Sequence, residues 1–186
     1  VARKGMWRHI GSDRDGQVEM QGFKALIAVH EPAFQNWAAF AKAFLTHVNP
    51  HTGRRYADEP GMPYIAMVNE GSIGYRVQEA RETPAMQAAW AAWLKQKRAQ
   101  DPAFAEIPDT MPLTMNGKAG SAVALFVADT EAKMVARMKA FLRDEIGCKA
   151  LISNYNCGTH YQPLQPVREA LYDYVDDHFY VDHPHF

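Results

Sequence analysis

The sequence predicts an α/β fold built around a parallel sheet. Short apolar runs alternate with longer segments whose apolar residues recur at helical spacing, in the order strand, helix, strand, helices, strand, helix, strand. Such alternation is typical of parallel strands joined by right-handed helical crossovers. The chain has 186 residues, of which 47% are apolar and 22% charged, so it can bury one sizeable core. We therefore treat residues 1–186 as a single domain.

The first half of the chain contains two predicted strands and one helix. Residues 23–29 form a short apolar run that predicts a strand or a buried extended segment. Pro32 suits the first turn of a helix, and the apolar spacing extends that helix over residues 32–47. A polar loop at 51–61 precedes a second apolar run at 64–68, which reads as a buried strand. The apolar positions of the helix are Phe34, Trp37, Ala38, Ala41, Phe44 and Leu45.

A second helix is predicted to begin at Thr83-Pro84, with Thr83 as its cap and Pro84 at its first position. Its tryptophans could line a sugar subsite, but their helical spacing favours core packing. Residues 101–120 are rich in Pro, Asp, Asn and Gly and predict a long loop. Residues 116–121 lack the spacing of a phosphate-binding loop and are interpreted as part of that loop. The apolar stripe of the second helix, which begins at Pro84, is Met86, Trp90, Trp93 and Leu94.

The last part of the chain predicts a third helix between Asp129, as its cap, and Gly147, as its left-handed terminator. A strand is expected at 148–152, a short helix at 163–171 and a final strand at 174–180. The apolar face of the third helix is Met134, Val135, Met138, Phe141 and Leu142.

Composition limits the partners. The chain has 20 basic and 21 acidic residues and a net charge of −1, so nothing indicates a nucleic-acid or anionic-membrane partner. The apolar runs are too short to span a bilayer, and no signal peptide is visible. Cys148 and Cys157 do not form a CxxC motif, which favours two free thiols and leaves a disulfide open.

Polar residues follow several predicted strands. Asn69 and Glu70 end the strand at 64–68, Asn154 follows the next predicted strand, and His178 and Tyr180 end the last one. In a parallel sheet these ends lie on one face, where α/β barrels place their chemistry. A carboxylic acid against an apolar wall can act as a general acid. The competing interpretations are a solvated loop for Glu70, a turn for Asn69, and packing for His178 and Tyr180.

Several motifs occur in a fixed order along the chain. They are LTHVNPHTG at 45–53, YADEP at 56–60, Asn69-Glu70, FLRDEIG at 141–147 and DYVDDH at 173–178. In this combination the chain resembles clan A glycoside hydrolases, and most closely their cellulase-like, family 5-like bacterial members. The resemblance spans about residues 24–186. It implies part of a (β/α)8 barrel, covering roughly the third to sixth βα units.

The resemblance also implies roles for four residues. Glu70 is similar to the acid/base at the end of the fourth barrel strand, and Asn69 to the amide that binds a neighbouring sugar hydroxyl. His178 and Tyr180 are similar to the pair at the end of the sixth strand, where the tyrosine hydroxyl binds the nucleophile. The reaction implied is retaining hydrolysis of a β-linked poly- or oligosaccharide, with the nucleophilic glutamate outside this chain.

Together with the polar opening at residues 1–16, this predicts an incomplete barrel domain from a longer protein. No cofactor is expected. The expected partners are a carbohydrate substrate and either the missing barrel segment or a second copy, because an incomplete barrel exposes strand edges. The isolated chain is expected to be inactive, and the resemblance points to a secreted or periplasmic protein.

Two other functions remain open. His178, Asp182, His183 and His185 are ligand types suited to zinc or iron, which suggests a metal-dependent hydrolase. Loss of the second carboxylate would instead leave a non-catalytic carbohydrate-binding domain.

Overall fold

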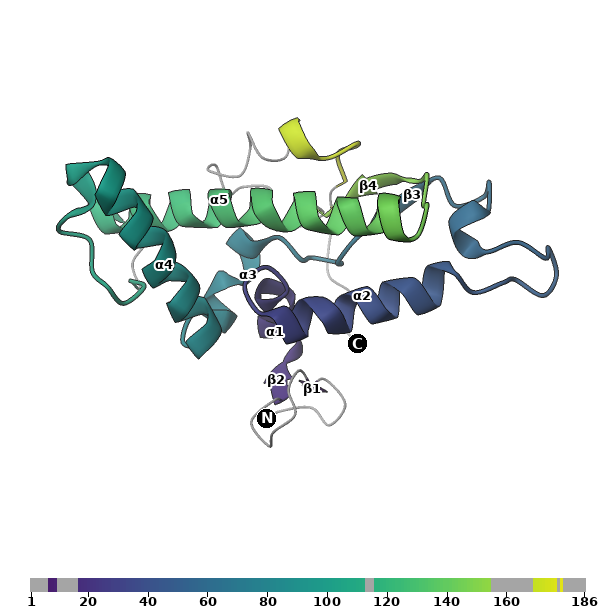
Figure 1. Cartoon of the computed structure of the whole chain (residues 1–186), viewed down its shortest axis with the longest axis horizontal. Coiled ribbons are helices and arrows are strands. Elements are labelled where there is room, and N and C mark those ends of the chain that lie inside the picture. Colours follow the sequence, from purple (N-terminus) through teal and green to yellow (C-terminus); the bar gives the residue numbers. More distant parts are fainter. Residues whose placement is uncertain (1–6, 10–16, 113–115, 155–168, 177, 179–186) are drawn as a thin grey trace, which may run out of the picture.

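The computed structural model describes residues 7–9, 17–112, 116–154, 169–176 and 178, with side chains described from residue 22 onward. It is a mixed α/β fold in which helices dominate (Figure 1). The elements in chain order are β1 (Trp7–His9), β2 (Gln17–Glu19), α1 (Met20–Leu26), α2 (Glu31–Leu45), η1 (Tyr56–Asp58), β3 (Tyr64–Ala66), α3 (Ile73–Ala80), α4 (Pro84–Gln100), η2 (Pro102–Phe104), α5 (Gly117–Ala140), η3 (Phe141–Glu145) and β4 (Leu151–Ser153).

The predicted parallel pairing is present between β3 and β4. Tyr64 pairs with Leu151, and Ala66 pairs with Ser153. The connection between the two strands contains α3, α4 and α5. The strand predicted at 64–68 is therefore confirmed, although it is shorter and less buried than expected, since Tyr64 is 58% exposed. The remaining pair in the described part of the chain, β1 with β2, is antiparallel.

One part of the core lies between α4 and the first half of α5. Trp90 is fully buried, and its ring lies 5.3 Å from that of Trp93 and 5.5 Å from that of Phe126. The Thr83 hydroxyl accepts a hydrogen bond from the Met86 N–H at the start of α4. The sequence prediction of a helix capped by Thr83 with a buried tryptophan stripe is thus confirmed.

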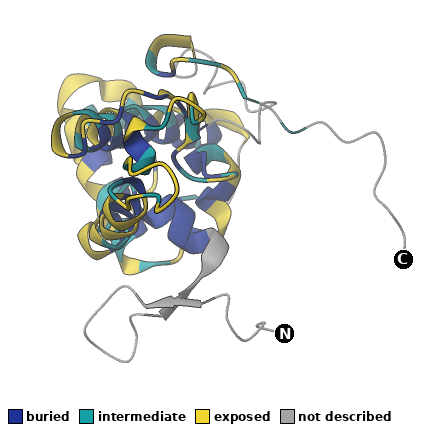
Figure 2. Ribbon diagram, turned by 90° about the vertical axis from the view of Figure 1, so that its right-hand side faces the viewer, coloured by how far each residue is buried: buried dark blue, intermediate teal, exposed yellow. Residues whose placement is uncertain are grey.

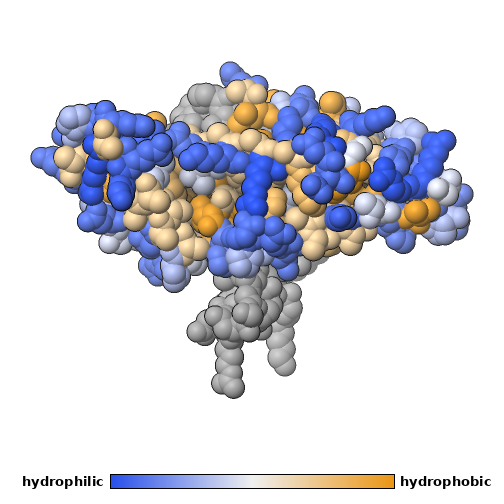
Figure 3. All heavy atoms as spheres, viewed as in Figure 1, coloured by the Kyte–Doolittle hydropathy of each residue, from blue (hydrophilic) through white to orange (hydrophobic). Residues whose placement is uncertain are grey.

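Helix α2 packs along the second half of α5, so the two helices run side by side (Figure 1). The Phe141 ring contacts those of Phe34 and Trp37. The Trp37 indole also donates a hydrogen bond of 3.0 Å to the Met67 carbonyl, which fixes the end of β3 against α2. Buried residues of the molecule collect in the interior, between the helices (Figure 2). On the face shown in Figure 3, hydrophilic surface dominates both ends of the long axis, with apolar surface between them.

Two sequence predictions are wrong for a shared reason, namely that a helical stripe was not recognised. Residues 23–29 are not a strand: α1 ends at Leu26, and a turn follows. Phe23, Leu26 and Ile27 are all buried, which is the spacing of one helix face. Helix α5 begins at Gly117, inside the predicted loop, rather than at Asp129, because buried Val123 extends its apolar stripe toward the N-terminus.

Asp129 instead lies within α5 and accepts a hydrogen bond from the Trp93 indole at 2.8 Å. The prediction for Gly147 is confirmed, since its φ of +75° is the left-handed conformation that ends a helix.

The C-terminal predictions are only partly met. Strand β4 begins at Leu151 rather than at Cys148, because the Arg143 guanidinium binds the Cys148 and Ala150 carbonyls. Residues 169–171 are helical, and the rest of the helix predicted at 163–171 lies outside the described residues. Residues 174–176 and 178 are not in a strand. The hydrogen-bonding groups of Ile152 on this edge of β4 are already used by Asp173, whose carboxylate accepts the Ile152 N–H and whose N–H donates to the Ile152 carbonyl.

Candidate functional site

Glu70 lies just beyond the C-terminal end of β3, on the short loop that leads to α3. Its φ of 51° is in the left-handed region, which non-glycine residues seldom adopt. Such a conformation persists only where the surroundings hold it, and it is frequent at functional sites. The unusual backbone turns the chain sharply between β3 and α3 and sets the direction of the Glu70 side chain.

The Glu70 side chain contacts two other polar groups. Its Oε2 accepts a hydrogen bond of 2.6 Å from Arg76 Nη2, and Arg76 Nε donates to the Glu70 carbonyl at 3.1 Å. Its Oε1 lies 3.4 Å from His178 Nδ1. The Glu70 and His178 side chains are 26% and 28% exposed, although the His178 Nδ1 that faces Glu70 is itself buried. The structure thus brings together two residues that the sequence singled out and that lie far apart in the chain.

Asn69 turns in a different direction from Glu70. It lines a cleft of about 380 Å³ between α1, α2 and the end of β3, and Glu70 is not among the lining residues. The polar groups of the cleft come from Lys24, Asn36 and Asn69, and Phe40 contributes an aromatic ring that is 65% exposed. The cleft therefore combines hydrogen-bonding side chains with an accessible aromatic surface next to the Glu70 loop.

A buried carboxyl group behind this loop was missed by the sequence analysis. Glu131 of α5 is fully buried, and it accepts hydrogen bonds from the Ile73 N–H at 2.6 Å and the Tyr172 hydroxyl at 2.8 Å. Burial raises the pKa of Glu131 to about 7, while the contacts with Ile73, Tyr172 and Asn154 oppose the rise. A signal was available in the sequence, because Glu131 stands four residues from both Val127 and Val135 on the apolar stripe of α5.

Several predicted site residues lie outside the described part of the chain. They are Tyr180, Asp182, His183 and His185. Within the described residues, no three His, Cys, Asp or Glu side chains are grouped so that they could hold a metal ion. The metal-site hypothesis therefore gains no support from the placement of His178.

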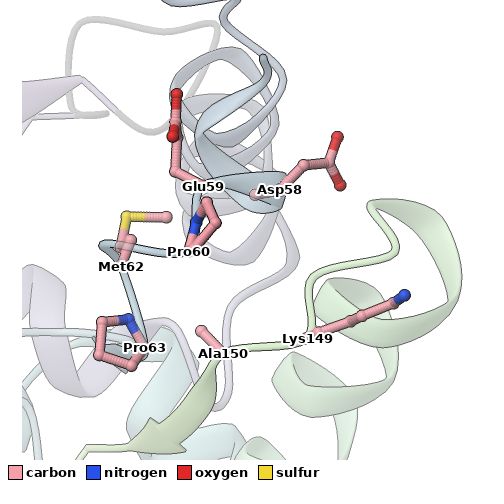
Figure 4. Close-up of a pocket in the computed structure, with 8 residues that line it drawn as sticks. Asp58, Glu59, Pro60, Met62, Pro63, Lys149 and Ala150 are labelled. Atoms are coloured by element: carbon pink, nitrogen blue, oxygen red, sulfur yellow. The ribbon is translucent and has the colours of Figure 1, made fainter. Parts of the chain in front are cut away.

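A second cavity lies at the opposite ends of the two strands, by Pro63 before β3 and Lys149 before β4 (Figure 4). The Asp58 and Lys149 side chains extend to the same side of it. Asp58 is paired with Arg55 at 2.7 Å, and this contact lowers the pKa of Asp58. Because it lies at the other end of the strands from Glu70, this cavity does not belong to the candidate site.

No protein-family model, curated protein or solved structure matches this chain. Among the helices that the structure describes, none is both long enough and apolar enough to cross a membrane. The interpretation of the site therefore depends on the geometry of its own residues.

Gly71→Ala is expected to destabilise the protein by about 1–3 kcal/mol, because a methyl group does not fit at this position. A Cβ atom there would lie 2.4 Å from the Val68 Cβ and 2.9 Å from the Val68 carbonyl oxygen. The loop must shift to relieve this overlap, which would displace Glu70 from His178. Urea denaturation of the variant measures the cost.

Gly61→Ala is the matched control, because nothing lies within 4 Å of a Cβ atom at Gly61. Equal unfolding midpoints for the two variants would contradict the tight turn at Gly71.

Proposed function

We propose that this chain is part of the catalytic domain of a retaining glycoside hydrolase, a (β/α)8 barrel to which it contributes roughly the third to sixth units. Glu70 is the acid/base, the substrate is a β-linked poly- or oligosaccharide, and the nucleophilic glutamate lies outside this chain. The observation that carries the proposal is the contact between Glu70 and His178 beyond the C-terminal end of a parallel strand.

The contacts of Glu70 assign different tasks to its two oxygens. Oε2 is held by Arg76 at 2.6 Å, so Oε1, which faces His178, is the oxygen that can carry a proton. In the first step the nucleophilic glutamate outside this chain bonds to the anomeric carbon, the bond from that carbon to the leaving sugar oxygen breaks, and Oε1 donates its proton to that oxygen. In the second step the Glu70 carboxylate removes a proton from a water that attacks the anomeric carbon, and the bond to the nucleophile breaks to release the product. Arg76 keeps the side chain in one orientation through both steps.

The cleft beside Asn69 supports a carbohydrate as the ligand. Its amide and amino groups, from Asn36, Asn69 and Lys24, can bond to sugar hydroxyls. The exposed Phe40 ring offers a flat apolar surface for the C–H face of a sugar ring. A site with a few polar groups on an apolar wall is typical of small-molecule recognition.

The Arg76 contact favours a second candidate, a non-catalytic carbohydrate-binding domain. The Arg76 guanidinium lies 2.6 Å from Glu70 Oε2, an arrangement that is also common in structural ion pairs with no part in catalysis. On this alternative the cleft binds sugar and Glu70 is a structural ion-pair partner of Arg76.

Glu70→Gln in the full-length protein is expected to lower kcat on a β-linked oligosaccharide by about 10²–10⁴-fold, because the amide cannot transfer a proton. Glu79→Gln is the control, since Glu79 is the other carboxylate partner of Arg76, at 3.4 Å. It should leave kcat unchanged.

Full activity in Glu70→Gln would overturn the acid/base assignment. Sugar binding without hydrolysis by the unaltered protein would support the carbohydrate-binding alternative. Stoichiometric zinc, with activity abolished by a chelator, would support a metal-dependent hydrolase.

A further inference from the structure

We infer that Glu131 is a positioning residue that holds the loop between β3 and α3, and with it the direction of Glu70. Its importance for catalysis rests on the proposed function, whereas its hold on the loop does not. Glu131 is not among the residues that line the cleft beside Asn69, so it would act through the backbone of the loop, where it binds the Ile73 N–H.

Glu131 fixes the C-terminal end of this loop. Its Oε2 accepts the N–H of Ile73, the first residue of α3, at 2.6 Å. The first N–H groups of a helix have no partner inside the helix, so a buried one needs an acceptor from elsewhere. The second oxygen, Oε1, accepts the Tyr172 hydroxyl at 2.8 Å. Both carboxyl oxygens are therefore used, and the side chain has one well-defined orientation.

The same group of buried polar side chains fixes the N-terminal end of the loop. Asn154, which follows β4 and is fully buried, accepts the Val68 N–H with its Oδ1 at 2.7 Å. The Asn154 side chain also lowers the pKa of Glu131, against the rise that burial causes. Residues 69–72 are therefore held at both ends, while Gly71 is packed tightly against Val68 in the middle.

Protonation of Glu131 changes these contacts. The ionised carboxylate accepts strongly at both oxygens, whereas the neutral acid has one hydroxyl that must itself donate. The groups that face it are the Ile73 N–H from α3, the Asn154 side chain after β4 and one titratable group, the Tyr172 hydroxyl. A proton taken from water by Glu131 thus weakens the hold on the loop that carries Glu70.

Backbone amide resonances of the full-length protein, followed from about pH 5 to about pH 8.5, test this inference. The Ile73, Glu70 and Gly71 amides should shift together with a midpoint near 7, the pKa of Glu131. Glu131→Gln should abolish that titration. Tyr172→Phe, which removes only a hydroxyl, should move the midpoint upward, because it removes a donor that favours the charged form.

Glu106→Gln is the control, since its side chain is 85% exposed and distant from the loop in the chain. A titration at Ile73 that does not extend to Glu70 and Gly71 would overturn the positioning role, and so would a titration that persists in Glu131→Gln. A shared titration in a protein that hydrolyses no glycoside would leave this inference standing and remove the proposed function. In an active enzyme, Glu131→Gln should flatten the pH profile of kcat near pH 7 and change KM little.

Discussion

Trp90→Ala is expected to lower the free energy of unfolding by about 3–5 kcal/mol, a large share of the stability of an ordinary domain. The Trp90 ring is fully buried between α4 and α5, against Trp93 and Phe126. Its indole N–H also donates a hydrogen bond of 3.1 Å to the Pro108 carbonyl. The variant therefore loses apolar contacts, leaves a cavity, and removes the contact that holds the loop after η2 against α4.

Urea denaturation followed by circular dichroism measures this loss. Phe40→Ala is the control: Phe40 is also an aromatic residue on a helix, but it is 65% exposed. Its removal should cost less than about 1 kcal/mol. If the two variants unfold at the same urea concentration, the packing between α4 and α5 does not stabilise the fold as described.

Stability is expected to fall by about 3 kcal/mol as the pH rises from about 4.5 to about 7, owing to Glu131 alone. Burial raises the pKa of this group from 4.5 to about 7 in the folded protein. Between these values the folded state keeps a proton that the unfolded state has lost, so raising the pH favours unfolding. The contribution is fully present below the unfolded pKa and is lost as the pH passes through the folded pKa.

Comparison of unfolding free energies with Glu131→Gln isolates this effect from other carboxyl groups. Some of those act in the opposite direction and at lower pH, as with Glu31, whose pKa Arg137 and Gln35 lower to about 2. The difference between the unaltered protein and the variant should therefore change with pH mainly above 4.5. Parallel stability curves for the two proteins would show that Glu131 does not titrate in this range.

The parts of the fold that could be predicted are those with local physical signals. The Thr83 cap and the tryptophan spacing define α4, and the apolar spacing after Pro32 defines α2. Helix α1 was missed because a short continuous apolar run fits a buried helix as well as a strand. The start of α5 was missed because Asn116 and Gly117 are residue types typical of loops. In the structure, however, Asn116 is the N-cap of α5.

The candidate site likewise has features that local sequence predicts and features that depend on the folded chain. The placement of Glu70 after a strand follows from local sequence, whereas its proximity to His178, which is not in a strand, arises only once the chain has folded. The Arg76 contact was not predicted, although Arg76 lies only six residues from Glu70, because it depends on the left-handed backbone at Glu70. The contacts of Glu131 depend on three distant segments, which no spacing rule relates to one another.

The pairing of β3 with β4 also has a consequence for the order of folding. About half of the chain lies between Tyr64 and its partner Leu151. Closing so long a loop costs entropy that two three-residue strands cannot offset by themselves. We therefore expect the helices between them to dock first, through the contacts of Trp90 and Phe126, and the strands to pair in a late step. In that order of events, the loop that carries Glu70 acquires its shape at the end of folding, because the Val68–Asn154 contact requires the paired strands.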